Sequence, residues 1–174
     1  LAHNPTDGLY PPKHKKKEKT WWDKDQVMQF FKETQSFRPR HLQFFQMAFL
    51  TGMRRSELAG LKWEHVDLAS EPPTIHVKDT LQQITGKGLV TLDPKTDSSS
   101  RKIEIGPMTV SLLRSIQGGQ QVMKVDLGPS RQSSSYVFTR PDGRPIDPDQ
   151  ATHDFTDIVR QTDLPPITLH DMRH

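Results

Sequence analysis

Apolar residues recur at helical spacing in several stretches of the chain. The first stretch follows Thr20 and Asp23, either of which can cap a helix. Its inward face is expected at positions i, i+3, i+4 and i+7, which here are Val27, Phe30, Phe31 and Thr34. A second helix is predicted to begin at Pro39 and to end at Gly52. Apolar side chains surround this second helix almost completely, so we expect it to be central and buried.

Shorter stretches of the same period predict the remaining helices. A short helix is expected over residues 56–61, and a longer one begins at Pro107 and is weakened at Gly118-Gly119. Another helix is expected around residues 149–161, and a closing helix follows Pro165-Pro166.

The period changes to two in the middle of the chain. Residues 74–78, 89–92 and 102–105 alternate between apolar and polar side chains, and residues 86–88 and 97–100 supply turns between them. This pattern predicts a three-stranded antiparallel meander. Together with the helices, it indicates an α+β fold that is mainly helical and carries a small sheet.

The composition excludes several classes of protein. A chain of 174 residues is long enough for one domain with a sizeable core, although only 32% of its residues are hydrophobic. Cysteine is absent, which excludes disulfides, thiolate catalysis and cysteine-ligated zinc. No stretch approaches the roughly 20 apolar residues of a membrane span, and no segment resembles a signal peptide. We therefore expect a cytoplasmic protein.

Positive charge is concentrated near the start of the chain. The formal net charge is +3, but residues 13–19 hold five of the 24 basic and one of the 21 acidic residues. The rest of the chain has 19 basic and 20 acidic residues. Residues 1–19 are predicted to be a basic connector to an N-terminal domain, and residues 20–174 a folded domain. The lysines of the connector either contact DNA phosphates or only keep a linker solvated: Lys13, Lys15, Lys16, Lys17 and Lys19.

One candidate site residue follows the glycine that ends the central helix. Arg54 lies two residues after Gly52, where a rigid scaffold can direct its guanidinium. A guanidinium stays charged and presents a planar fork of donors, which suits a phosphate. Glu57, three residues later, is placed to fix the arginine through an ion pair. The alternative is an ordinary surface pair at helical spacing, which contributes little.

Three further candidates lie in two other segments. Lys95 follows Pro94 at a turn between predicted strands, where it can reach a phosphate or protonate a leaving oxygen. His170 and Arg173 are three residues apart at a helix start and therefore share a face. An imidazole beside a guanidinium can bind one phosphate and transfer a proton.

Other kinds of catalytic site fit the sequence less well. His170 and His174 have the spacing of a zinc-binding pair, but the following acid is an aspartate, a cation lies between them, and no third ligand follows His174. The clustered carboxylates of two-metal nucleases are absent, as are the serine-hydrolase and nucleotide-binding motifs. We therefore expect no metal and no cofactor.

Taken in order, three of these segments resemble the catalytic domain of the tyrosine recombinases, the phage-integrase family. Residues 51–58 (Thr-Gly-Met-Arg-Arg-Ser-Glu-Leu) are similar to the first conserved box of that family. Residues 94–103 are similar to its strand-turn lysine segment, and residues 169–174 to the start of its second box. Residues 1–19 look like the linker from its core-binding domain. The resemblance spans nearly the whole chain.

The resemblance implies a role for each candidate. Arg54 and Arg173 would bind the scissile phosphate, Lys95 would protonate the leaving 5′ oxygen, and His170 would assist proton transfer. The nucleophile of the family is a tyrosine that forms a 3′-phosphotyrosyl link, and strand exchange reverses that step without ATP or metal. Double-stranded DNA would be the substrate, and family members act as tetramers on paired sites.

The chain departs from the family where the nucleophile is expected. That tyrosine lies beyond the second box, whereas the tyrosines of this sequence are Tyr10, in the connector, and Tyr136, in an upstream extended segment. We therefore expect a catalytic domain that stops before its nucleophile, is monomeric, and is inactive alone. Two alternatives are a DNA-binding or regulatory relative without catalysis, and an α+β interaction module in which the motif residues are scattered.

Overall fold

The structure is a computed structural model of the 174-residue chain, and it describes residues 21–37, 41–92 and 100–173. Expectations for the connector, for Pro39 and for Lys95 fall outside these ranges. Five α-helices and three short 3-10 helices lie within them. The α-helices are α1 (Lys24–Phe37), α2 (Leu42–Thr51), α3 (Arg55–Ala59), α4 (Pro107–Leu127) and α5 (Pro148–Val159); the 3-10 helices are η1 (Trp63–His65), η3 (Gly128–Ser130) and η4 (Asp171–Arg173).

Three helix ends follow the signals in the sequence, whereas the closing helix predicted after Pro165-Pro166 is only the 3-10 turn η4. Asp23 caps α1, since its Oδ1 accepts the backbone N–H of Gln26 at 2.9 Å, while Gln26 Oε1 accepts the N–H of Asp23 at 3.0 Å. Asp147 caps α5 in a similar way, accepting the backbone N–H of Asp149 at 2.8 Å. Gly52 ends α2 in the left-handed region at φ 61°, as predicted.

Helix α4 continues to Leu127 through Gly118-Gly119, the point at which the sequence predicted a weaker helix. The reason lies in tertiary contacts of the next residue. Gln120 accepts the indole N–H of Trp63 at 2.9 Å and donates to the backbone carbonyl of Val137 at 2.8 Å. These bonds hold the helix where its own propensity is weak.

The sheet is three-stranded and antiparallel, but one of its strands was predicted wrongly. It consists of β1 (Val66–Asp67), β2 (Thr74–Val77) and β5 (Arg101–Glu104) in the order β1-β2-β5. The predicted strand at residues 89–92 instead belongs to a separate hairpin of β3 (Thr80–Ile84) and β4 (Gly88–Leu92). The sequence did not predict strand β3, because its apolar residues, Leu81 and Ile84, do not alternate with polar residues at a period of two.

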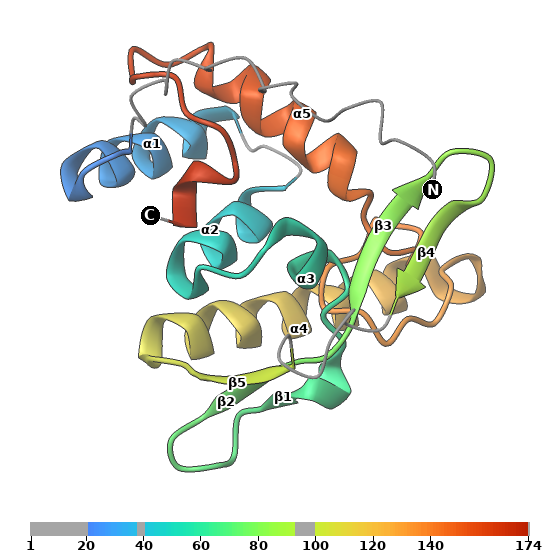
Figure 1. Cartoon of the computed structure of the whole chain (residues 1–174). Helices are drawn as coiled ribbons and strands as arrows, with labels where there is room; N and C mark the ends of the chain where they lie inside the picture. The colour runs from blue at the N-terminus through green and yellow to red at the C-terminus, as the bar shows by residue number, and fades with distance from the viewer. Residues whose placement is uncertain (1–20, 38–40, 93–99, 174) are drawn as a thin grey trace, which may run out of the picture.

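Helix α2 lies in the middle of the molecule, with α5 above it and α4 below it in Figure 1. The three-stranded sheet lies beyond α4, and the β3–β4 hairpin projects at one side. An aromatic cluster joins α1, α2 and α5, with ring centroids 5.5 Å apart for Phe30 and Phe155 and 5.3 Å apart for Phe45 and Phe155. The predicted central position of the second helix is therefore confirmed.

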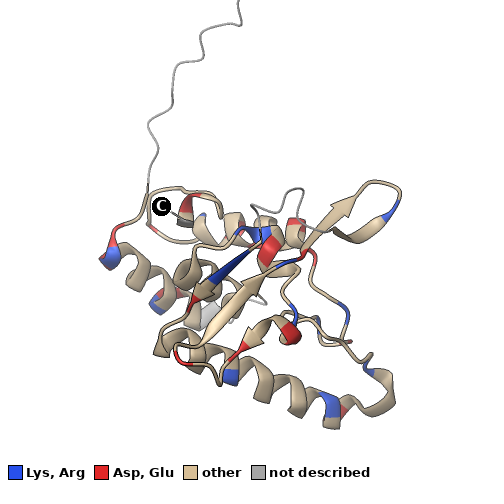
Figure 2. Cartoon of the chain, turned by 60° about the horizontal axis from the view of Figure 1, so that its bottom comes forward, with Lys and Arg blue, Asp and Glu red and all other residues tan. Residues whose placement is uncertain are grey.

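The fold is α+β and mainly helical, as predicted. Among the described residues, no helix is both long and apolar enough to cross a membrane. Lysine and arginine are interspersed with aspartate and glutamate over the described elements (Figure 2). The lysine-rich residues 13–19 lie outside them.

Candidate functional site

The turn between α2 and α3 directs Arg54 away from the core. Met53, the residue before it, is buried at 1% exposure. Arg54 has an extended backbone and precedes the first residue of α3. Its side chain is 55% exposed, so the guanidinium extends from a fixed backbone toward solvent.

A buried carboxylate lies beneath this arginine. Glu57 is only 3% exposed. Its Oε1 accepts from Arg54 Nη1 at 2.7 Å, and its Oε2 accepts from the backbone N–H of Arg54 at 2.8 Å. The ion pair that the sequence predicted between Glu57 and Arg54 is therefore present.

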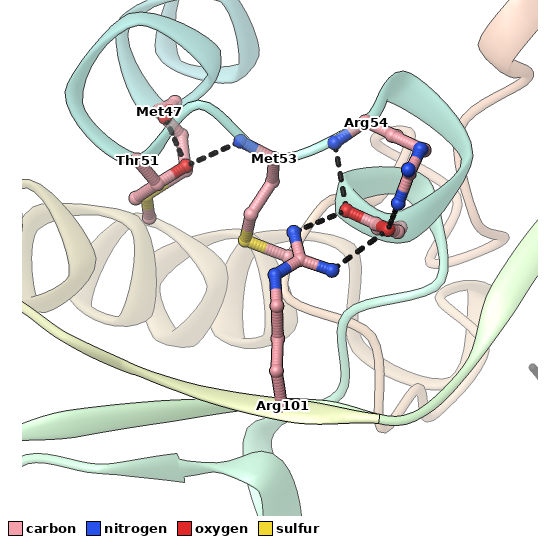
Figure 3. Close-up of polar contacts among 6 residues, drawn as sticks. Met47, Thr51, Met53, Arg54 and Arg101 are labelled. Carbon is pink, nitrogen blue, oxygen red and sulfur yellow. Dashed lines mark hydrogen bonds and ion pairs between the residues drawn. The ribbon is translucent and has the colours of Figure 1, made fainter. Parts of the chain in front are cut away.

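The Glu57 carboxylate has a second cationic partner, Arg101, which was not predicted from the sequence. Arg101, at the start of β5, donates from Nη1 to Oε1 of Glu57 at 3.0 Å and from Nη2 to Oε2 at 2.9 Å. Figure 3 shows Arg101 extending from its strand and Arg54 from the helical side toward the same group. The two residues of this contact are 44 positions apart, so no local pattern could reveal it.

These four hydrogen bonds keep the carboxylate ionised. Burial acts to raise the pKa of Glu57, but the hydrogen bonds from Arg101 and Arg54 outweigh it and lower the pKa to about 2. The hydrogen bond to Glu57 likewise raises the pKa of the Arg101 guanidinium. Two positive groups and one negative group therefore share this position, which leaves one net positive charge.

Arg54 and His170 line a common pocket of about 220 Å³. Its other lining residues are Arg55, Ser56 and Leu169. Two segments more than a hundred residues apart in the sequence thus meet at one hollow, and His170 is exposed there. Among the candidates that the sequence indicated, these two line the same pocket.

The segment that carries His170 is held by its own turn and by the core. Asp171 Oδ2 accepts from the backbone N–H of Thr168 at 2.8 Å and from its hydroxyl at 2.6 Å. Leu169 and Met172, the residues on either side of His170-Asp171, are buried. The imidazole of His170 is therefore presented by a short, well-anchored segment.

The remaining candidates are not tested by these contacts. The backbone of Arg173 belongs to η4, but its side chain lies outside what the structure describes, as do Lys95 and the five connector lysines. Tyr136 does not line the pocket; its hydroxyl is 2.7 Å from the hydroxyl of Thr91 on β4. Among the described residues, no three His, Asp or Glu side chains are grouped to hold a metal ion.

The sequence of the chain also matches the pattern of a known protein family. The pattern of the phage integrase family matches residues 20–174, which is most of the chain. The chain belongs to the phage integrase family. The family match includes the segments that carry Arg54 and His170, and it confirms the resemblance seen in the sequence.

Curated relatives include an integrase and a tyrosine recombinase from bacteria. The chain is 28% identical over 174 residues to the ICEBs1 integrase of Bacillus subtilis, covering 100% of this chain and 46% of that protein. It is 28% identical over 141 residues to a XerC-like tyrosine recombinase of Caldanaerobacter subterraneus, covering 75% of this chain and 36% of that protein. The chain thus spans less than half the length of these two phage-integrase relatives.

A solved structure shares the fold. The Tn1549 transposon integrase in complex with transposon right end DNA superimposes with a TM-score of 0.75 at 22% identity. The match covers 98% of this chain and 55% of that one. At this identity the likeness establishes the phage-integrase fold, in agreement with the predicted fold class.

Proposed function

We propose that this chain provides the catalytic domain of a site-specific DNA recombinase, which cleaves and rejoins strands through a 3′-phosphotyrosyl intermediate. The observation that carries the proposal is the pocket shared by Arg54 and His170 in a chain of the phage integrase family. An exposed guanidinium fixed by a buried carboxylate suits an anion whose charge grows during reaction, as that of a phosphodiester does.

The proposed reaction gives each candidate a task. Arg54 and Arg173 bind the non-bridging oxygens of the scissile phosphate. A tyrosine hydroxyl gives its proton to His170, and its oxygen bonds to phosphorus while the bond to the 5′ oxygen breaks. Lys95 donates a proton to that leaving oxygen. His170 assists proton transfer. Rejoining is the reverse, with a 5′ hydroxyl attacking the phosphotyrosine, so the energy of the bond is conserved.

The nucleophile is proposed to follow residue 174 in the protein expressed from the complete gene. By the family resemblance the nucleophile lies after the second box, whereas Tyr10 and Tyr136 both come before it in the sequence. Tyr136 also contacts the β3–β4 hairpin through Thr91, away from the residues that line the pocket. Residues 1–174 alone are therefore proposed to be monomeric and to cleave no DNA.

Double-stranded DNA is the proposed partner, which implies action in the cytoplasm of a bacterial host. The Tn1549 integrase, which shares the fold, was solved in complex with DNA. The complete protein is proposed to act as a tetramer on paired sites. The connector lysines would add phosphate contacts before the catalytic domain: Lys13, Lys15, Lys16, Lys17 and Lys19.

The proposal is tested by a covalent-adduct assay on the protein expressed from the complete gene. The probe is a set of nicked duplexes from the DNA that flanks the gene, from which a short cleaved product diffuses away. We expect a covalent protein–DNA adduct that disappears when a tyrosine after residue 174 is changed to phenylalanine. DNA binding without an adduct would overturn the proposal in favour of a non-catalytic DNA-binding relative.

A further inference from the structure

We infer that Arg101 is a positioning residue of this site. It keeps Arg54 available for a phosphate by binding the Glu57 carboxylate and compensating its negative charge. The inference rests on the proposed function, in which Arg54 contacts the scissile phosphate. Arg101 itself does not line the pocket shared by Arg54 and His170. Its effect on the reaction is therefore expected to pass through the carboxylate.

The guanidinium of Arg101 donates to both oxygens of the Glu57 carboxylate, whereas the guanidinium of Arg54 donates to one. Arg101 takes both oxygens, with Nη1 and Nη2 at 3.0 and 2.9 Å, which fixes the plane of the carboxylate. The guanidinium of Arg54 contacts Oε1 through Nη1, while Oε2 accepts the backbone N–H of Arg54. Within the described residues, the other guanidinium N–H groups of Arg54 make no hydrogen bond to Glu57, so they remain for an anion.

The charges around Glu57 favour the same role for Arg101. With Arg101 present, the Glu57 carboxylate is compensated and the positive charge of Arg54 is left in excess. Without Arg101, Arg54 would be the main cation compensating a buried carboxylate, and it would be drawn toward both of its oxygens. The pair would then be neutral. Arg55 cannot replace the lost charge, because it is paired with Asp149 at 2.8 Å.

The position of Arg101 makes this contact rigid. Arg101 begins β5 and is paired with Val77 of β2, so its backbone belongs to the three-stranded sheet. Its side chain is 34% exposed and reaches the turn before α3. The ion pair between Arg101 and Glu57 thereby joins the sheet to the helical half of the molecule.

The experiment compares four variants of the protein expressed from the complete gene. Arg101→Met removes the charge and the paired hydrogen bonds, whereas Arg101→Lys keeps only the charge. Lys102→Met is the matched control, since Lys102 is the next residue of β5, is exposed, and makes no contact with Glu57. Arg54→Ala tests the proposed function itself. Melting temperatures identify any variant that fails to fold.

Single-turnover adduct formation is measured at saturating DNA. Arg101→Met is expected to slow it about ten- to a hundredfold, the effect of a misplaced charged donor. Arg101→Lys should recover part of this loss, and Lys102→Met should differ little from the unaltered protein.

A second substrate separates positioning from general destabilisation. A second set of substrates carries a neutral methylphosphonate in place of the scissile phosphate. On these substrates Arg101→Met should slow adduct formation less, because the positive charge of Arg54 no longer has an anionic partner. An equal penalty on both substrates would overturn the inference, as would Arg101→Met reacting as fast as Lys102→Met. If Arg54→Ala itself cleaves normally, the proposed function fails, which is a distinguishable result.

Discussion

Two arginine–carboxylate pairs in this molecule have the same spacing in sequence and opposite surroundings. At the start of α3, Arg54 contacts Glu57 at 2.7 Å, and the carboxylate is only 4% exposed. At the end of α5, Arg160 contacts Asp157 at 3.1 Å, and both side chains are more than 60% exposed. The Glu57 carboxylate holds in place an arginine that lines a pocket, whereas Arg160 and Asp157 form a solvated surface contact. Burial of the acid, rather than spacing, distinguishes the two.

The largest effect on stability is expected when the buried carboxylate is removed. Glu57→Ala leaves two guanidiniums without their shared counter-charge and should lower the free energy of unfolding by about 3 kcal/mol. Asp157→Ala is the control and should change it by no more than about 0.5 kcal/mol. Urea denaturation measures both values. Similar losses in the two variants would remove the distinction between the pairs.

The contribution of Glu57 to the free energy of unfolding should also depend on pH. The pKa of Glu57 is lowered to about 2 in the folded protein from 4.5, so its contribution to stability is complete above pH 4.5 and is lost as the pH falls toward 2. That contribution is about 3 kcal/mol. Unfolding free energies between pH 6 and pH 2 should therefore fall more steeply in the unaltered protein than in Glu57→Gln. Parallel curves would show that Glu57 does not titrate in this way.

The smallest effect is expected at the exposed pair. A double-mutant cycle on Arg160 and Asp157 should give a coupling free energy of about 0.5 kcal/mol or less, reduced further by salt. The corresponding cycle on Arg101 and Glu57 should give a clearly larger value that salt changes little. A strong coupling at Arg160 would mean that exposure is a poor guide to the strength of these pairs.

Local signals in the sequence account for much of the fold and for part of the site. Gly52 predicted the end of α2, and the three-residue spacing predicted the contact between Arg54 and Glu57, because both depend on neighbouring residues. Arg101 could not be predicted as a partner of Glu57, since that contact requires β5 to lie beside α3.

Strand pairing was the least predictable part for the same reason. The sequence indicated that residues 89–92 are extended, which is correct, but not that their partner is β3 rather than the sheet. The pocket shared by Arg54 and His170 likewise depends on how η4 packs against α2, which no local pattern specifies. The family resemblance supplied that link.

The proposed role of Arg54 at the scissile phosphate is tested by adduct formation of Arg54→Ala and Arg160→Ala in the protein expressed from the complete gene. Each variant loses an arginine that contacts an acid three residues away, so the loss of charge is matched. We expect Arg54→Ala to form no detectable covalent adduct with DNA while remaining folded, and Arg160→Ala to react like the unaltered protein. Adduct formation by Arg54→Ala at a normal rate would contradict the proposed role of Arg54.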